Sequence, residues 1–285
     1  MKNNSLVLLK PEVLIRRRVG SFLSRFEDLG FEVARIACFF FTRELCQKHY
    51  KEYIEDMLVF ENILYSLSIG ISFALEVTGE NAIQTIRKHT GYFRPEQNAP
   101  DSLRGKYSNS LLEGSWIHAS DTVELSKLEL ERFFSFPLNL KDYFNKKLER
   151  ALFIIKPDGI KRKLAGRIIS VFEKKGFLVS FLKISTYSAL SLKTQYKHIL
   201  ESKPEVYYNM EKELINKKIL IGILEGSNVL SEGRKLVGDT FPEKASPESI
   251  RGRFSPSISE GNLVHFSDSE DSYLKEKELY LPELL

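Results

Sequence analysis

Cysteine, tryptophan and long apolar runs are scarce in this chain. Its 285 residues include 2 cysteines and 1 tryptophan. Cys38 lies in an apolar run and Cys46 in a helical pattern, which favours buried thiols over a disulfide or a metal pair. No stretch approaches the roughly 20 apolar residues of a membrane span, and residues 1–5 lack the apolar run of a signal peptide. These absences predict a cytoplasmic protein with no membrane partner.

A strong charge of one sign is also missing. Lysine and arginine number 42 and the acidic residues 38, which leaves a net charge of +4 spread over both halves. A nucleic-acid partner is therefore not expected, although small anions would be accepted. With 42% apolar and 28% charged residues the composition is globular, and the length predicts two domains.

Several catalytic motifs are absent. The chain has neither Gly-x-x-x-x-Gly-Lys-Ser/Thr nor Gly-x-Gly-x-x-Gly, so side chains would have to hold any nucleotide. Metal-ligand spacing is absent as well, and we predict no metal site in the protein. Without Gly-x-Ser-x-Gly a serine hydrolase is not expected, and Ser120 and Ser267 are better interpreted as phosphate donors or helix caps. The run Arg16–Arg18 predicts a solvated helix face.

What the chain does contain is an internal repeat. The phrase His-x-Ser-Asp begins at His118 and again at His265, which are 265 − 118 = 147 residues apart. Lys10 returns as Lys156, 156 − 10 = 146 residues later. Because the offset changes by one residue only, the two halves are collinear copies of one repeated unit. Other matching pairs are Gly20 and Gly166, Tyr50 and Tyr196, Arg87 and Arg234, Gly91 and Gly238, Arg104 and Arg251, and Glu129 and Glu276.

Both copies predict the same order of elements, in which strands and helices alternate. Short apolar runs predict strands, and apolar residues three or four positions apart predict helices. The expected strands are 7–9, 33–41, 71–77 and 116–118 in the first half, and 152–155, 177–184, 219–224 and 263–265 in the second. Arg104 and Arg251 are expected at the start of the fourth strands.

Helices are expected between these strands. The first helix of each copy should end at Gly30 or Gly176, the next should be capped by Thr42 or Ser188, and Asp121 or Asp268 can cap the last. The order predicts an α+β fold made of tandem ferredoxin-like (split βαβ) domains, each with a four-stranded antiparallel sheet and helices. We expect domains at 1–137 and 148–285. Residues 138–147 should form a connection that packs against the domains instead of extending into solvent.

His118 and His265 are the best candidates for catalysis. They are the histidines that recur in the repeat, and each follows an irregular loop of about twelve residues, a length typical of functional loops. Glu129 and Glu276 lie eleven residues beyond each histidine. Such a carboxylate could bind one ring nitrogen and leave the other as a nucleophile. The alternative is a structural histidine and a solvated helix glutamate.

Four arginines flank the two long loops, and a lysine recurs at the end of each first strand. Arg87 and Arg234 end helices, Arg104 and Arg251 follow the loops, and pairs of guanidinium groups suit phosphate oxygens. Lys10 and Lys156 end buried strands, where an ammonium group is costly unless it meets an anion. The alternative for the arginines is a helix-dipole partner and a surface side chain.

These residues closely resemble the nucleoside diphosphate kinase family in order and spacing. In the second half the resemblance rests on Lys156-Pro157-Asp158-Gly159, Tyr196, Gly233-Arg234, Gly238-Asp239-Thr240, Ser249-Ile250-Arg251-Gly252, Asn262, His265-Phe266-Ser267-Asp268 and Glu276. The first half is similar through Lys10-Pro11, His49-Tyr50, Arg87, Gly91, Ser102-Leu103-Arg104-Gly105, His118-Ala119-Ser120-Asp121 and Glu129.

The resemblance implies a ping-pong transfer of the γ-phosphate from a nucleoside triphosphate such as ATP to a nucleoside diphosphate. His118 and His265 would be the nucleophiles, oriented by Glu129 and Glu276. The remaining implied nucleotide-binding residues are Lys10, Tyr50, Arg87 and Arg104 in the first half, and Lys156, Tyr196, Arg234, Thr240, Arg251 and Asn262 in the second. Mg²⁺ would be bound mainly through the nucleotide phosphates. Family members also imply self-association beyond the internal pseudo-dimer.

The two halves depart from the family pattern in different ways. Phe93 replaces a phosphate-binding threonine, Ser115 an asparagine, and Glu12-Val13 an Asp-Gly pair. In the second half Phe266 replaces the glycine after the histidine. The residue that stacks on the base aligns to Glu205 or Val206 there, whereas Phe60 could serve in the first half. We therefore predict a divergent first half and a second half in which His265 carries most turnover. The alternative is a tandem scaffold or nucleotide-sensing module with weak catalysis.

Overall fold

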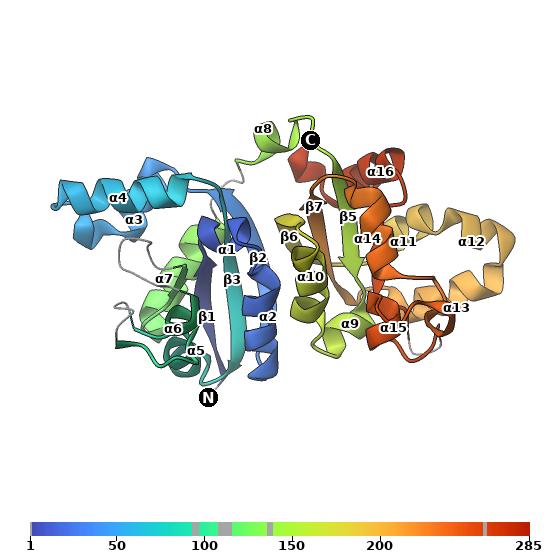
Figure 1. Cartoon of the computed structure of the whole chain (residues 1–285), viewed down its shortest axis with the longest axis horizontal. Coiled ribbons are helices and arrows are strands. Elements are labelled where there is room, and N and C mark those ends of the chain that lie inside the picture. The colour runs from blue at the N-terminus through green and yellow to red at the C-terminus, as the bar shows by residue number, and fades with distance from the viewer. Residues whose placement is uncertain (1, 93–96, 108–115, 136–138, 259–260) are drawn as a thin grey trace. The chain divides into compact units, whose positions relative to one another are not determined.

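The computed structural model describes residues 2–92, 97–107, 116–135, 139–258 and 261–285. It divides into two compact units, Met1–Asp142 and Tyr143–Leu285, and each is described by itself (Figure 1). No helix in these ranges is both long and apolar enough to cross a bilayer.

Each unit contains a four-stranded antiparallel sheet, which confirms the predicted fold class. In the first unit the order is β2-β3-β1-β4 and in the second β6-β7-β5-β8, so the short last strand of each sheet lies at an edge beside the first strand. The strands are β1 (Lys2–Leu9), β2 (Glu32–Phe40), β3 (Ile71–Glu80), β4 (Ile117–Ala119), β5 (Arg150–Ile155), β6 (Leu178–Thr186), β7 (Lys218–Glu225) and β8 (Val264–Phe266).

Helices cover both faces of each sheet. The longer ones are α2 (Val19–Asp28), α3 (Arg43–His49), α4 (Met57–Ser68), α5 (Ala82–Thr90) and α7 (Val123–Phe134) in the first unit, and α10 (Ala165–Lys174), α11 (Ala189–Gln195), α12 (Lys197–Ser202), α13 (Pro204–Leu214), α14 (Val229–Val237) and α16 (Glu270–Tyr280) in the second. As predicted, Thr42 and Ser188 cap α3 and α11. Gly30 and Gly176 follow α2 and α10 with positive φ angles of 88° and 104°.

The two faces of the first sheet follow from the alternation of side chains along β1. Leu6 and Leu8 belong to a buried cluster with residues of α3, α4 and α7, among them Leu45, Phe60 and Phe133. Val7 and Leu9 are also fully buried and face the other way. The same alternation along β4 places His118 on one face of the sheet and its neighbours Ile117 and Ala119 on the other.

Short helices correct three predictions. The sequence predicted one helix between the first two strands of each copy, but the short helices α1 (Pro11–Ile15) and α9 (Pro157–Lys161) begin directly at the prolines and precede it. Arg104 and Arg251 lie on α6 (Leu103–Tyr107) and α15 (Ile250–Phe254), not at the start of strands. Arg16–Arg18 connect α1 and α2 as an exposed turn rather than a helix face.

The caps of the last helices differ from the prediction by one residue. Thr122 and Ser269 accept the cap hydrogen bonds of α7 and α16, so Asp121 and Asp268 are free for other contacts. Cys38 and Cys46 are buried free thiols, as predicted. Within the described residues lie the 3₁₀ turns η1 (Lys51–Tyr53), η3 (Pro242–Lys244) and η5 (Pro282–Leu284).

The segment expected to connect the domains includes α8 (Lys141–Phe144). Phe144 is buried, and its ring packs edge-on against Phe181 at 5.9 Å. Arg150 donates to the carbonyls of Tyr143, Phe144 and Lys146. The guanidinium group thereby fixes the end of α8 on the second unit.

Candidate active site

His118 and His265 lie at the centre of the short edge strands. His118 pairs with Leu8 of β1, and His265 pairs with Ile154 of β5. Because side chains alternate along a strand, His265 lies on one face of its sheet while its neighbours Val264 and Phe266 lie on the other. Both histidines are partly buried, so each ring has a protected side and a side open to ligands.

The protected side of each ring meets a carboxylate. His265 Nε2 lies 2.5 Å from Glu276 Oε1, and His118 Nε2 lies 2.9 Å from Glu129 Oε1. In a neutral ring that donates from Nε2, Nδ1 keeps its lone pair. Burial acts to raise the pKa of Glu129, but the contacts with His118 and Ser120 outweigh it and lower that pKa. The predicted histidine–glutamate pairs therefore form in both units.

Ser120 and Ser267 are fully buried, and Thr122 and Ser269 cap the last helices instead, which corrects the helix-cap alternative for both serines. Ser267 Oγ donates to Glu276 Oε2 at 2.6 Å and accepts from the Leu152 backbone N–H at 3.0 Å. Ser120 makes the same two contacts with Glu129 and Leu6. Each serine thus fixes the carboxylate that orients the histidine.

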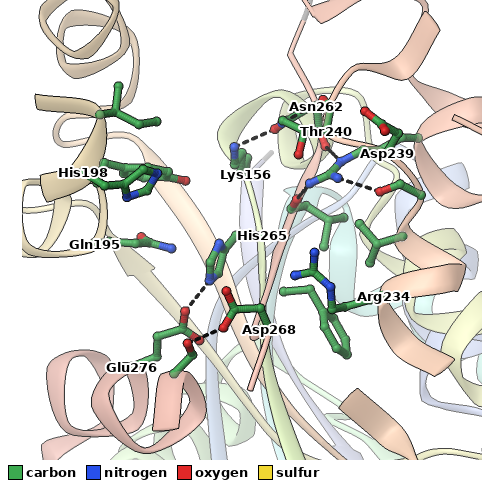
Figure 2. Close-up of a pocket in the computed structure, with 18 residues that line it drawn as sticks. Lys156, Gln195, His198, Arg234, Asp239, Thr240, Asn262, His265, Asp268 and Glu276 are labelled. Carbon is green, nitrogen blue, oxygen red and sulfur yellow. Dashed lines mark hydrogen bonds and ion pairs between the residues drawn. The ribbon is translucent and has the colours of Figure 1, made fainter. Parts of the chain in front are cut away.

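In the second unit His265 faces a cavity of about 540 Å³, a volume suited to a small-molecule ligand. Ten residues around it are labelled in Figure 2: Lys156, Gln195, His198, Arg234, Asp239, Thr240, Asn262, His265, Asp268 and Glu276. Lys156 Nζ donates to Asn262 Oδ1 at 2.6 Å, and Asn262 Nδ2 donates to the Thr240 carbonyl at 3.4 Å. The structure therefore brings the predicted residues of this half together.

The cationic side chains of this cavity differ in burial and in their contacts. Arg251 is buried, which lowers its pKa to about 10, and it donates to the carbonyls of Gly238, Val264 and Asn262. It therefore anchors the long loop to β8. Arg234 is exposed and lines the cavity. Lys156 Nζ lies 5.7 Å from the centre of the Tyr196 ring.

The first unit repeats much of this arrangement. Lys10 Nζ lies 5.5 Å from the Tyr50 ring centre, and burial lowers the pKa of Lys10 to about 8. Arg104 donates to the carbonyls of Gly91 and Ile117, and burial lowers its pKa to about 10. Arg87 is in ion-pair contact with Asp121. Phe93 and Ser115, two of the predicted departures, lie outside the described residues.

His49, which belongs to the motifs of the resemblance but was given no site role from the sequence, lies beside His118. Its ring lies edge-on to His118 with centres 4.6 Å apart. His49, His118 and Glu129 have ligand atoms within 4.8 Å of one another, although they are far apart in the sequence. Arg132 donates to His49 Nδ1 at 3.1 Å, so a guanidinium group already occupies one ligand atom and repels a cation. We therefore interpret the group as part of the histidine environment rather than a metal site.

Burial also lowers the pKa of His49 to about 2, so its ring is neutral. In the second unit Gln195 and His198, for which the sequence predicted no role, also line the cavity. Asp239 and Asp268, which were named in motifs but not as site residues, line it as well. An offset of 146, the one that relates Tyr50 to Tyr196, would have paired His49 with Gln195.

Phe60 is not available as a platform for a base. It is 2% exposed and belongs to the core beneath α4, so the interpretation made from the sequence was wrong. Met57 and Leu58, at the start of the same helix, are exposed instead. In the second unit Glu205 and Val206 are exposed on α13 but do not line the cavity described above.

Comparison with known proteins places these sites in a family. A model described as "Nucleoside diphosphate kinase" matches residues 3–137 and 149–284. The chain is 38% identical to nucleoside diphosphate kinase B of Flaveria bidentis over 136 residues, 48% of this chain and 90% of that protein. A crystal structure of the apo nucleoside diphosphate kinase of Encephalitozoon cuniculi is 36% identical and covers 47% of this chain and 89% of its own, with a TM-score of 0.44.

A longer relative matches both halves at once. The chain is 30% identical to thioredoxin domain-containing protein 6 of Xenopus laevis over 277 residues, or 94% of this chain. It spans 41% of that protein's length. The family model covers almost all of the present sequence in two consecutive segments. The chain therefore belongs to the nucleoside diphosphate kinase family and contains two tandem copies of its domain.

Proposed function

We propose that the chain is a nucleoside diphosphate kinase that transfers the γ-phosphate of ATP or another nucleoside triphosphate to a nucleoside diphosphate through phosphohistidine. The observation that carries this proposal is the placement of His265. Its Nε2 is held by Glu276, and the same ring lines a cavity with Lys156, Arg234 and Asn262. A histidine oriented by a carboxylate and facing several cations suits nucleophilic attack on a phosphoryl group.

In the first half-reaction the Nδ1 lone pair of His265 attacks the γ-phosphorus. The bond to the bridging oxygen breaks, and its electron pair remains on the nucleoside diphosphate that leaves. The ring becomes cationic, and Glu276 stabilises that charge through Nε2. A second nucleoside diphosphate then attacks the phosphorus and restores the neutral ring. Lys156, Arg234 and Arg251 supply positive charge for the phosphate oxygens, and Thr240 and Asn262 supply polar contacts.

Mg²⁺ fits this site as a companion of the nucleotide. Asp268 accepts hydrogen bonds from Ser269 and Ser272, and Glu276 is engaged by His265 and Ser267. With these carboxylates occupied, the described cavity residues form no oxygen cage of the kind that holds Mg²⁺ alone. When bound through the phosphates, the ion would neutralise part of their charge.

Phosphohistidine formation tests the proposal. The intact chain incubated with ATP should acquire acid-labile, alkali-stable phosphate, and GDP should then remove it. His265→Ala should lose most of the label, His118→Ala little, and the double variant all of it. Absence of label on both histidines in the unmodified chain would contradict the proposed activity.

The two units need not contribute equally. We propose that His265 carries most turnover and that the first unit is the weaker site, because Arg87 is engaged by Asp121 and Phe60 is withdrawn into the core. The second candidate function is a scaffold or nucleotide-sensing module. It draws support from the relative named as a thioredoxin domain-containing protein, which is more than twice as long as the matched region. Weak nucleotide binding without exchange between nucleotides would favour the scaffold.

We also propose a cytoplasmic location and self-association beyond the two fused domains. The buried free thiols of Cys38 and Cys46 support a reducing compartment. Light scattering of the purified chain would test self-association, since a mass equal to one chain at micromolar concentration would contradict it.

A further inference from the structure

Gln195, the last residue of α11, lines the cavity together with His265. Figure 2 shows its amide nitrogen pointing toward the His265 ring. This nitrogen is buried, and it donates to no group in the described part of the chain. A buried amide donor without an acceptor is costly, so its orientation indicates that a ligand oxygen supplies the missing partner.

Tyr280 holds the other end of the amide. Its hydroxyl donates to Gln195 Oε1, and its ring is buried on α16, the helix that also carries Glu276. With the carbonyl oxygen fixed, the NH₂ group has to face the cavity. One helix therefore orients both the histidine ring, through Glu276, and the amide, through Tyr280.

The first unit has a different pair at the same place. α3 ends at His49 as α11 ends at Gln195, and Phe133 precedes Tyr280 by 280 − 133 = 147 residues. His49 packs edge-on against Phe133 at 5.0 Å, whereas Gln195 and Tyr280 share a hydrogen bond. The differences at the two positions are complementary, because the Tyr280 hydroxyl, which Phe133 lacks, donates its hydrogen bond to the Gln195 amide oxygen, which His49 lacks.

We propose that Gln195 is a catalytic residue that donates a hydrogen bond from Nε2 to a phosphoryl oxygen on His265. The inference rests on the proposed phosphohistidine mechanism. No proton is transferred in this contact: the amide stays neutral while the N–P bond forms and the P–O bond breaks. Because the contact forms when the phosphoryl group reaches His265, it accelerates transfer rather than tightening nucleotide binding.

The matched substitution is Gln195→Leu, which removes the amide and keeps most of the volume. In a His118→Ala background, single-turnover phosphorylation of His265 by ATP should slow about ten- to a hundredfold, with ADP affinity unchanged. Tyr280→Phe should act in the same direction but more weakly. Tyr273→Phe is the control, since Tyr273 is buried on the same helix but does not line the cavity. A wild-type rate in Gln195→Leu would overturn the proposal.

A second measurement separates this inference from the proposed function. Phosphoramidate can phosphorylate histidine chemically, without a nucleotide. In that product the side-chain amide resonance of Gln195 should shift, and phosphohistidine should hydrolyse at a different rate in Gln195→Leu. If ATP gives no label but these effects appear, the kinase proposal fails while the contact stands. An unmoved resonance with equal hydrolysis, or failure of phosphoramidate to label His265, would overturn the contact itself.

Discussion

The ring of Phe266 occupies the space that a side chain on Gly233 would need. A Cβ atom built on Gly233 would lie 2.1 Å from Phe266 Cζ, and Phe266 also packs against Phe172 with ring centres 5.7 Å apart. At the same places the first unit has Ile86 and Ala119. The larger side chain of the pair therefore lies on the helix in the first unit (Ile86 of α5) and on the strand in the second (Phe266 of β8). Phe266 is thereby accommodated on the sheet face opposite His265.

Exchanging the pair tests this complementarity. Phe266→Ala should destabilise the second unit by about 3–5 kcal/mol because it leaves a cavity, and Gly233→Ile should destabilise it because the side chain meets the ring. The double variant should recover part of the loss, with a coupling of roughly 0.5–3 kcal/mol. Urea unfolding, with hydrogen exchange of β5 and β8 amides, measures both. Purely additive effects would contradict the interpretation.

Glutamine substitutions test the histidine–glutamate pairs. Glu276→Gln keeps the shape but removes the charge that stabilises a cationic ring, so phosphorylation of His265 should slow about ten- to a hundredfold. Glu129→Gln is the matched control in the other unit and should leave His265 labelling unchanged. Rapid-quench labelling with ATP provides the rate. Equal rates for Glu276→Gln and the unmodified chain would exclude the orienting role.

The lowered pKa of Lys10 predicts that the protein takes up protons when a nucleotide binds. Burial lowers its pKa to about 8, so near pH 8 about half of these side chains are neutral before a ligand binds. A phosphate oxygen favours the charged form and raises the pKa. ADP binding at pH 8 should therefore take up protons, and binding to the first unit should weaken as the pH rises through 8. Calorimetry in buffers of different ionisation enthalpy measures the uptake, which Lys10→Met should abolish and Lys10→Arg should not restore.

Asp121→Ala should release Arg87 for a phosphate. The pair is partly exposed on both sides, so its own energy is small, but the substitution also removes a negative charge near the nucleotide. We expect ADP affinity of the first unit to rise about two- to fivefold, corresponding to roughly 0.4–1 kcal/mol. Asp268→Ala is the matched change in the second unit, where the aspartate accepts from Ser269 and Ser272. Weaker binding after Asp121→Ala would contradict this interpretation.

Arg150 and Glu225 form a buried ion pair, with side chains 3% and 9% exposed and Nε 2.8 Å from Oε1. Glu225→Leu leaves the guanidinium group without its carboxylate and should destabilise the second unit by about 3–5 kcal/mol. Arg150→Met combined with Glu225→Leu should cost less, because both charges are gone. Urea unfolding of the intact chain compares them, and a double variant less stable than Glu225→Leu would argue against burial as the cause.

The sequence predicted the strands well because burial of central strands leaves continuous apolar runs, such as Leu152–Ile155. The five-residue helices after Lys10 and Lys156 carry too few residues for periodicity and were missed. Arg104 and Arg251 were assigned to strands although Ser102 and Ser249, which accept from the N–H groups of Gly105 and Gly252, are cap signals. His49 was quoted only as the neighbour of Tyr50 and Gln195 had no local signal, since both reach the site through the packing of α3 and α11.

The serine in His-x-Ser-Asp has a consequence for interpreting related sequences. Ser120 and Ser267 connect the edge strand, the central strand and the glutamate of the last helix within a fully buried environment. A copy that had lost catalysis would still need this serine to close its sheet. If the His-x-Ser-Asp motif persists in a degenerate copy, it therefore indicates selection for folding. The residues that line the cavity are the better guide to whether a copy is still catalytically active.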